Sequence, residues 1–174
     1  QGNMCLLDEV LDWNPSQLRC RSRAHRLLTN PLRLGHQLSA VCGIEFAAQA
    51  MAVHGALVQD ELAHSALDNS EEIAEPRHGY LMSLRQVNIH TLRLDDISGD
   101  LEIFVERIGG DGVTVIYEFR VDAQAHQLLS GRAAVGCFSP TAEGLNLIQH
   151  LLLIKLSNNG ENFGERFLFI VKFY

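Results

Sequence analysis

The sequence predicts an α+β domain in which antiparallel strands surround one long, buried helix. Three observations support this prediction: small apolar residues run through positions 39–67, four segments rich in β-branched and aromatic residues follow, and a glycine-rich turn separates two of those segments. The chain has 174 residues, of which 47% are hydrophobic and 20% are charged. It is therefore long enough and apolar enough to close one hydrophobic core.

The central helix is expected over residues 39–67, with Ser39 as its N-cap. Small or apolar side chains occupy nearly every position from Ala47 to Val53, and a helix that is apolar on nearly every side is a buried one. Small side chains also allow a sheet to approach the helix axis closely. We therefore expect strands to wrap this helix.

Strands are expected on both sides of this helix in the sequence. Before the helix, Arg19, Arg21 and Arg23 alternate within residues 17–27, which is the period of a strand. After it, the acidic and polar segment 68–76 is expected to form an exposed loop. Four antiparallel strands are then expected at 80–90, 99–108, 113–121 and 126–138, with a hairpin turn at 109–112.

The composition changes at Pro140. Residues 1–139 form one unit, whereas residues 140–174 carry no net charge and contain four of the eight phenylalanines. We expect 140–174 to be a C-terminal extension of uncertain role. It fits either a helix and a strand packed on the main domain or an appendage foreign to its fold, and the sequence leaves both open.

Charge and cysteine content exclude several classes of protein. A net charge of −7 disfavours broad binding to nucleic acid phosphates. The strongly apolar run 151–156 contains Lys155 and is too short to span a bilayer. The sequence has no metal-binding histidine spacing, P-loop or GxGxxG motif, so no metal or cofactor is expected. The cysteines lack CxxC spacing and fit reduced thiols of a soluble, cytoplasmic protein; they are Cys5, Cys20, Cys42 and Cys137.

Several short motifs follow one another in a recognisable order. They are the opening segment 5–11, Gly35-His36, Ile44-Glu45, Ala48-Gln49-Ala50, Gly99-Asp100-Leu101 and Gly131-Arg132-Ala133. Together they resemble the 3-hydroxyacyl-(acyl carrier protein) dehydratases of bacterial type II fatty acid synthesis over residues 4–138. The phrase GIEFAAQAMAVHG at 43–55 is similar to the dehydratase-like subunits encoded with the enzymes of aryl polyene pigment synthesis. The resemblance implies a hot-dog fold for residues 1–139, a curved antiparallel sheet around one long central helix.

The resemblance also implies roles for two residues, His36 as general base and Glu45 as general acid. Dehydration of a 3-hydroxyacyl thioester needs a base at C2 and an acid for the departing C3 hydroxyl. Gln49 lies four residues after Glu45, on the same helix face, and can hold its carboxyl group or a water beside it. Apolar neighbours should raise the pKa of Glu45. Backbone N–H groups near Gly43 could polarise the thioester carbonyl.

Each of these candidates has a simpler interpretation. An acidic residue such as Glu45 in a first helical turn can merely complement the helix dipole. The dehydratases carry a longer, proline-containing loop between the histidine and the acid, so His36 equally fits a solvated loop residue. Arg19, Arg21 and Arg23 could bind an acidic carrier protein or could form the solvent face of a strand.

Three functions remain open at this stage. The first is a dehydratase acting on acyl chains carried by an acyl carrier protein or by coenzyme A, with its site shared across a homodimer or a heterodimer. The second is a hot-dog thioesterase in which ionised Glu45 directs water or attacks the carbonyl. The third is a non-catalytic hot-dog subunit that completes an active partner.

Overall fold

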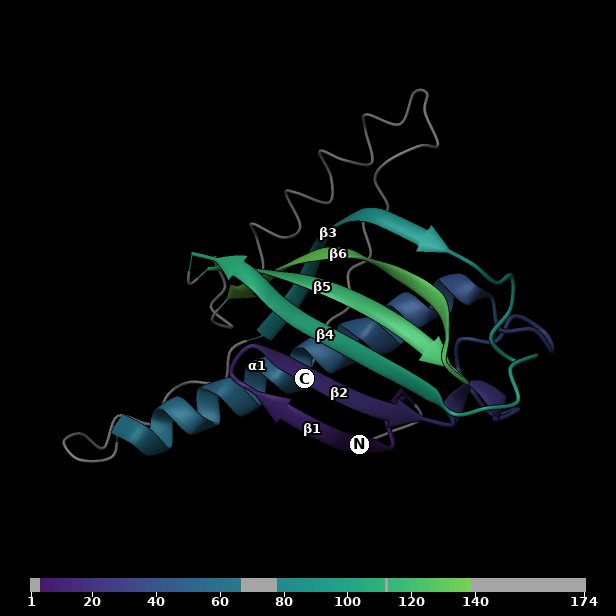
Figure 1. Ribbon diagram of the computed structural model, residues 1–174, viewed down its shortest axis with the longest axis horizontal. Coiled ribbons are helices and arrows are strands. Elements are labelled where there is room, and N and C mark those ends of the chain that lie inside the picture. The colour runs from purple at the N-terminus through teal and green to yellow at the C-terminus, as the bar shows by residue number, and fades with distance from the viewer. Residues whose placement is uncertain (1–3, 67–77, 112, 139–174) are drawn as a thin grey trace, which may run out of the picture.

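The computed structural model describes residues 4–66, 78–111 and 113–138. Within them, six antiparallel strands form one sheet in the order β1-β2-β4-β5-β6-β3, and helix α1 lies against one face of this sheet (Figure 1). The elements are β1 (Glu9–Asn14), β2 (Gln17–Ser22), α1 (Gly43–Ala66), β3 (His78–Ile89), β4 (Leu101–Gly110), β5 (Thr114–Ala123) and β6 (His126–Phe138). Two short 3-10 turns, η1 (Ala24–Arg26) and η2 (Ala40–Cys42), precede the helix.

Strand alternation places rows of apolar side chains on the face that meets α1. Paired residues on neighbouring strands point to the same side of a sheet, so each row crosses the sheet as a continuous apolar band. One row consists of Cys20, Ile103, Val121 and Leu129, and all four are fully buried. In the neighbouring row, Gly131 lies beside Phe119, and a Cβ at this glycine would lie 2.9 Å from the ring. The bare glycine thus makes room for a buried aromatic ring.

Helix α1 is a core helix, as its small residues predicted. Phe46, Ala47 and Ala50 are fully buried against the sheet. The stretch Ala40–Leu62, with a mean hydropathy of 1.5, is long and apolar enough to span a membrane by length and composition alone. The apolar run 151–156 noted in the sequence is shorter. In the most apolar part of Ala40–Leu62, 44% of the residues are buried, and these include the side chains that pack against the sheet. The last turns of α1 extend beyond the sheet, and Leu62 is exposed there.

The N-terminal strands differ from the expected ones. The strand expected at 17–27 ends at Ser22, because the 3-10 turn η1 follows. Strand β1 was not expected, because its sequence shows no alternation of apolar and polar residues. In the structure none of its six residues is buried. The loop expected at 68–76 and the extension 140–174 lie outside the described residues.

Irregular backbone positions connect and bend the later strands. Gln124 and Ala125 form the two-residue turn between β5 and β6, and both have positive φ, as tight hairpin turns require. In β3, Gln86 has a φ of 52° at a point where the register with β6 shifts. Such bulges increase local twist and bend a strand, which lets β3 and β6 curve around α1.

Candidate functional site

Glu45 and Gln49 lie one turn apart near the start of α1, and both are half-buried. Gln49 Nε2 donates a hydrogen bond of 3.0 Å to Glu45 Oε1. Burial raises the pKa of Glu45, and the hydrogen bond from Gln49 partly opposes this effect. The pair therefore places a carboxyl group of elevated proton affinity at the beginning of the central helix.

Gly43 is the first residue of α1, and its contacts point to packing. A Cβ at this position would lie 2.2 Å from Leu129 Cδ2 on β6, so only glycine fits without displacing a core side chain. Its own N–H already donates to the carbonyl oxygens of Ala40 and Val41 in η2. Polarisation of a thioester carbonyl near Gly43 stays a prediction, and it would need a neighbouring N–H group as donor.

His36 lies on a tight turn ahead of the helix. The backbones of Leu34 and Gln37 exchange two hydrogen bonds across the turn, and Gly35 has a φ of 64°, which glycine adopts at little cost. The His36 side chain is exposed. Among the described residues no hydrogen bond joins it to Glu45, so the chain by itself does not assemble the expected base and acid as a contacting pair.

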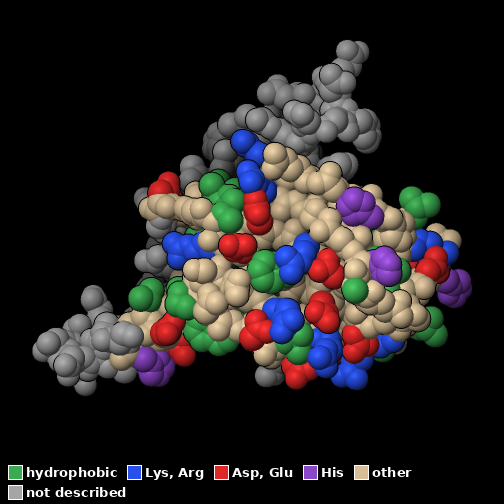
Figure 2. All heavy atoms as spheres, viewed as in Figure 1, with side chains coloured by type: hydrophobic (Ala, Val, Ile, Leu, Met, Phe, Trp, Pro, Cys, Tyr) green, Lys and Arg blue, Asp and Glu red, His purple; other side chains and the backbone are tan. Residues whose placement is uncertain are grey.

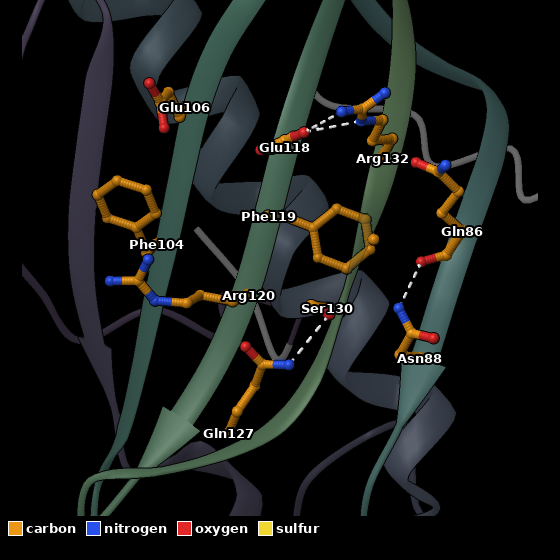
Figure 3. Close-up of a pocket in the computed structure, with 11 residues that line it drawn as sticks. Gln86, Asn88, Phe104, Glu106, Glu118, Phe119, Arg120, Gln127, Ser130 and Arg132 are labelled. Atoms are coloured by element: carbon orange, nitrogen blue, oxygen red, sulfur yellow. Dashed lines mark hydrogen bonds and ion pairs between the residues drawn. The ribbon is translucent and has the colours of Figure 1, made fainter.

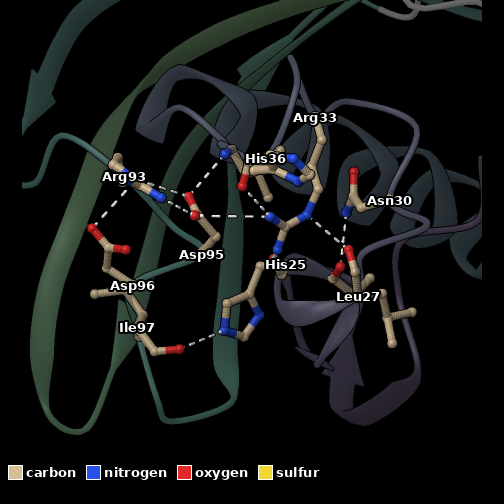
Figure 4. Close-up of polar contacts among 11 residues, drawn as sticks. His25, Leu27, Asn30, Arg33, His36, Arg93, Asp95, Asp96 and Ile97 are labelled. Atoms are coloured by element: carbon tan, nitrogen blue, oxygen red, sulfur yellow. Dashed lines mark hydrogen bonds and ion pairs between the residues drawn. The ribbon is translucent and has the colours of Figure 1, made fainter.

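A buried ion pair fixes this turn. Arg33 and Asp95 have side chains only 7% and 6% exposed, with 3.8 Å between Arg33 Nη1 and Asp95 Oδ2 (Figure 4). The Arg33 guanidinium also donates to three backbone oxygens, those of His25, Leu27 and His36, at 3.0, 2.8 and 2.6 Å. These bonds shape the loop from His25 to His36 around one cation.

Asp95 completes the cluster from the other side of the loop. It accepts the Leu38 N–H at 2.8 Å and the Arg93 Nε–H at 3.2 Å, and Arg93 also forms a salt bridge with it. The hydrogen bond from the Arg93 guanidinium is the main cause that holds the pKa of Asp95 well below its ordinary value. The carboxylate is therefore ionised at neutral pH and ties residues 33–38 to the segment after β3.

Arg19, Arg21 and Arg23 lie along β2 and just beyond it, exposed or half-exposed. Each is paired with an acidic residue on or beside β1: Arg19 with Asp12 at 2.5 Å, Arg21 with Glu9 at 3.3 Å and Arg23 with Asp8 at 3.7 Å. Basic and acidic side chains accordingly alternate over β1, β2 and β4 (Figure 2). The three arginines form a mixed surface rather than a purely basic one.

Two cavities formed by the described residues lie away from Glu45. The larger, about 620 Å³, is an open groove on the sheet face opposite α1, where Arg120 stacks on the Phe104 ring and Arg132 pairs with Glu118 (Figure 3). The smaller, about 160 Å³, lies beside Cys5 and Asn30. Neither cavity is lined by Glu45 or Gln49, so neither is a substrate channel that reaches the Glu45 carboxyl group.

The structure adds polar groups that sequence reasoning did not select. His54 is fully buried on α1, where its ring nitrogens bond to the Tyr117 hydroxyl and the Asn14 carbonyl oxygen, both at 2.9 Å. It therefore fastens the β1–β2 hairpin to the helix and the sheet. Within the described part of the chain, no group of three or more metal-ligating side chains occurs.

Comparison with known proteins assigns the family. The family model of ApeP-like proteins, described as ApeP dehydratase, matches residues 1–149. The chain belongs to the ApeP-like family. The ApeP-like assignment confirms the predicted relationship and the predicted dehydratase-like function. Among curated protein sequences, none matches this ApeP-like chain.

Solved structures were compared with the fold of this chain. The dehydratase heterocomplex ApeI:P from Xenorhabdus doucetiae matches the ApeP-like chain with a TM-score of 0.64 and 20% identity, covering 91% of this chain and 93% of that one. A thioesterase from Staphylococcus aureus gives 0.47 and 11%, with coverages of 74% and 91%. The dehydratase domain of the curacin polyketide synthase CurK module gives 0.40 and 10%, with coverages of 83% and 47%. The match to the ApeI:P heterocomplex, together with the six-stranded sheet and the central helix, confirms the predicted hot-dog architecture.

Proposed function

We propose that this chain is a hot-dog dehydratase subunit that removes water from 3-hydroxyacyl thioesters, with Glu45 as the general acid. The observation that carries the proposal is the half-buried Glu45 carboxyl group, which burial makes a weaker acid and which Gln49 holds in place. An acid must be protonated before it can donate, and a raised pKa increases the protonated fraction near neutral pH. Membership of the ApeP-like dehydratase family supports the same reaction.

The reaction balances with two protein groups. A base removes the C2 proton, and the electron pair of that C–H bond forms the C2=C3 bond. The C3–O bond breaks with its electron pair on oxygen, which takes the proton of Glu45 and leaves as water. The base is then protonated and Glu45 ionised, so proton exchange with solvent must restore both groups before the next turnover.

The base would act in a site shared between two subunits. His36 is exposed and has no hydrogen bond to Glu45 among the described residues, so it is available to a partner. Nearby, Leu34 and Leu92 are 89% and 88% exposed, and Leu92 O accepts the Ala40 N–H just before α1. A second hot-dog chain would cover these leucines, and the similarity of this chain to the dehydratase heterocomplex ApeI:P supports such an assembly.

An acyl carrier protein would deliver the substrate in this proposal. Arg19, Arg21 and Arg23 are candidates for its acidic surface, although their pairing with acidic residues reduces the positive potential that they offer. Charge reversal in Arg19→Glu should raise KM for a carrier-bound substrate and leave KM for a small thioester unchanged. The same reversal at the exposed Arg85, which lies on β3 at the opposite edge of the sheet from β1 and β2, is the matched control.

The decisive experiment is mass spectrometry of a 3-hydroxyacyl carrier protein after incubation with the chain, alone and together with a companion hot-dog subunit. Loss of one water is the expected result. Glu45→Gln should abolish it, because an amide cannot supply the proton, whereas Glu106→Gln removes an exposed carboxylate on β4 and should leave it unchanged.

Other outcomes assign the alternatives. Release of free thiol without prior loss of water would indicate a thioesterase that uses Glu45. Water loss that appears only after mixing and persists in Glu45→Gln would make this chain a non-catalytic partner. If His36→Ala lowers turnover only in the mixed sample, His36 serves the shared site.

A further inference from the structure

The side-chain amide of Gln49 has three hydrogen-bond partners, and only one of them is Glu45. Gln49 Oε1 accepts the Leu6 N–H at 2.9 Å, and Nε2 donates to the Met4 carbonyl oxygen at 2.8 Å. The third bond, from Nε2 to Glu45 Oε1, uses the remaining amide proton. We call residues 4–6 the N-terminal strap.

These partners allow one orientation of the amide. If the Gln49 amide were rotated by half a turn, its oxygen would face two acceptors, the Met4 carbonyl and the Glu45 carboxyl oxygen. Its NH₂ group would at the same time face another donor, the Leu6 N–H. All three contacts would become unfavourable, so the strap selects the orientation that presents a donor to Glu45.

The strap is itself fixed on its other side. The Leu6 carbonyl oxygen accepts a hydrogen bond from the Ser22 hydroxyl at 2.5 Å, and the Leu6 side chain is buried. Ser22 lies at the end of β2, and its hydroxyl oxygen also accepts the Ala24 N–H. Gln49 is therefore held by a backbone segment that is anchored to the sheet.

We propose that the N-terminal strap positions Gln49 so that Glu45 Oε1 is always a hydrogen-bond acceptor, which leaves Oε2 to carry the proton that reaches the substrate. Gln49 is thus a positioning residue that acts through Glu45, and the strap acts through Gln49. This inference rests on the proposed role of Glu45 as general acid. It assigns the proton to one of two otherwise equivalent oxygens.

The surroundings of Glu45 make this effect measurable. Within the described residues, no charged side chain contributes to its pKa shift, which arises from burial and from Gln49. The titratable neighbour is the Cys42 thiol, and burial raises its pKa, so it stays neutral where Glu45 titrates. A change in the titration of Glu45 can therefore be assigned to the Gln49 contact.

The test is carbon NMR of the full chain carrying ¹³C at the glutamate carboxyl carbons, with the Glu45 signal assigned by its loss in Glu45→Gln. Gln49→Met removes the donor without changing the side-chain length, and it should raise the Glu45 midpoint, because the hydrogen bond from Gln49 lowers the pKa of Glu45. Leu6→Pro removes the strap N–H and should shift the midpoint in the same direction. Gln59→Met changes an exposed glutamine on the same helix and should cause no shift.

A measurement on the unaltered chain avoids dependence on folded variants. The Leu6 amide proton should titrate with the midpoint of Glu45, because the Gln49 amide connects the two groups. A Leu6 signal that stays constant through the Glu45 titration, or a folded Leu6→Pro variant with an unchanged midpoint, would overturn the inference.

The same variants separate this inference from the proposed function. If Glu45→Gln retains dehydration, the proposed role of Glu45 fails. If Glu45→Gln is inactive but Gln49→Met and Leu6→Pro leave both the midpoint and the pH profile of kcat unchanged, only the positioning by the strap fails.

Discussion

Asp95→Asn tests whether the buried ion pair holds the turn that carries His36. The change keeps the side-chain shape but removes the negative charge, and it places an NH₂ group among the donors of Arg33, Arg93 and Leu38. Arg33 then stays buried, with only its backbone carbonyl acceptors to compensate its charge.

The expected loss follows from the partners of Asp95. Breaking a buried ion pair by removing one partner costs about 3–5 kcal/mol, and a hydrogen bond to a charged group contributes about 1.5–3 kcal/mol. Because Arg33 keeps three acceptors and Arg93 is partly exposed, the lower end applies. We expect the free energy of unfolding to fall by about 3 kcal/mol, and Tm by about 6–12 °C.

Urea unfolding followed by circular dichroism measures this loss. The control is Asp96→Asn, the neighbouring residue, which is 63% exposed and pairs with Arg93 at 3.3 Å. An exposed pair of this kind contributes about 0–1 kcal/mol. Equal losses in the two variants would refute the argument that burial makes the Asp95 pair important.

The pH dependence provides a further check on Asp95. Its folded pKa lies below the unfolded value of 3.8, so its contribution is complete above that value and is lost as the pH falls towards the folded pKa. The stability deficit of Asp95→Asn should therefore be constant from pH 7 to about 5 and shrink below about pH 4. A deficit that grows on acidification would contradict the assignment.

Three further predictions concern packing, histidine burial and a turn. Gly43→Ala should lower the free energy of unfolding by about 1–3 kcal/mol in urea titrations, because its Cβ would displace the buried Leu129; an unchanged midpoint would show that the core adapts freely. Burial lowers the pKa of His25 and of His54, so as the pH falls the unfolded chain takes up protons before the folded chain does, and the free energy of unfolding should fall below about pH 6.5. Calorimetry at pH 7 and pH 5.5 should detect this loss of stability. The loss should be smaller in His54→Gln. Ala125→Gly should raise Tm, because the positive φ of Ala125 costs a non-glycine residue about 1 kcal/mol and glycine adopts it without this strain. A lower Tm would argue against strain in this turn.

The elements that the sequence predicted best are those buried on one face or on all faces. Helix α1 and strands β4 to β6 carry apolar residues at the spacing of their secondary structure, so pattern alone located them to within four residues. Strand β1 was not predicted, because it has no buried residue and is held in the sheet only by its pairing with β2. Its existence depends on partners that a local pattern does not contain.

The candidate site divides in the same way. Glu45 and Gln49 could be paired from their spacing, because one helical turn fixes their separation. The contact between Gln49 and Leu6 joins residues 43 positions apart, and Asp95 bonds to a residue 57 positions away. No local spacing encodes such contacts. The sequence therefore indicated the acid, but neither the backbone that orients it nor the ion pair behind His36.

Because the last turns of α1 extend beyond the sheet, the helix has two regions of different local stability. Residues near Phe46 and Ala50 can open only if the sheet separates from them, whereas the turns around Asp60 and Leu62 face water. Backbone amide protons in the first half should exchange with deuterium only through global unfolding, and those beyond Gln59 through local fraying. The end of the helix that carries Glu45 is therefore the rigid one, and motion in the free end need not reach the acid.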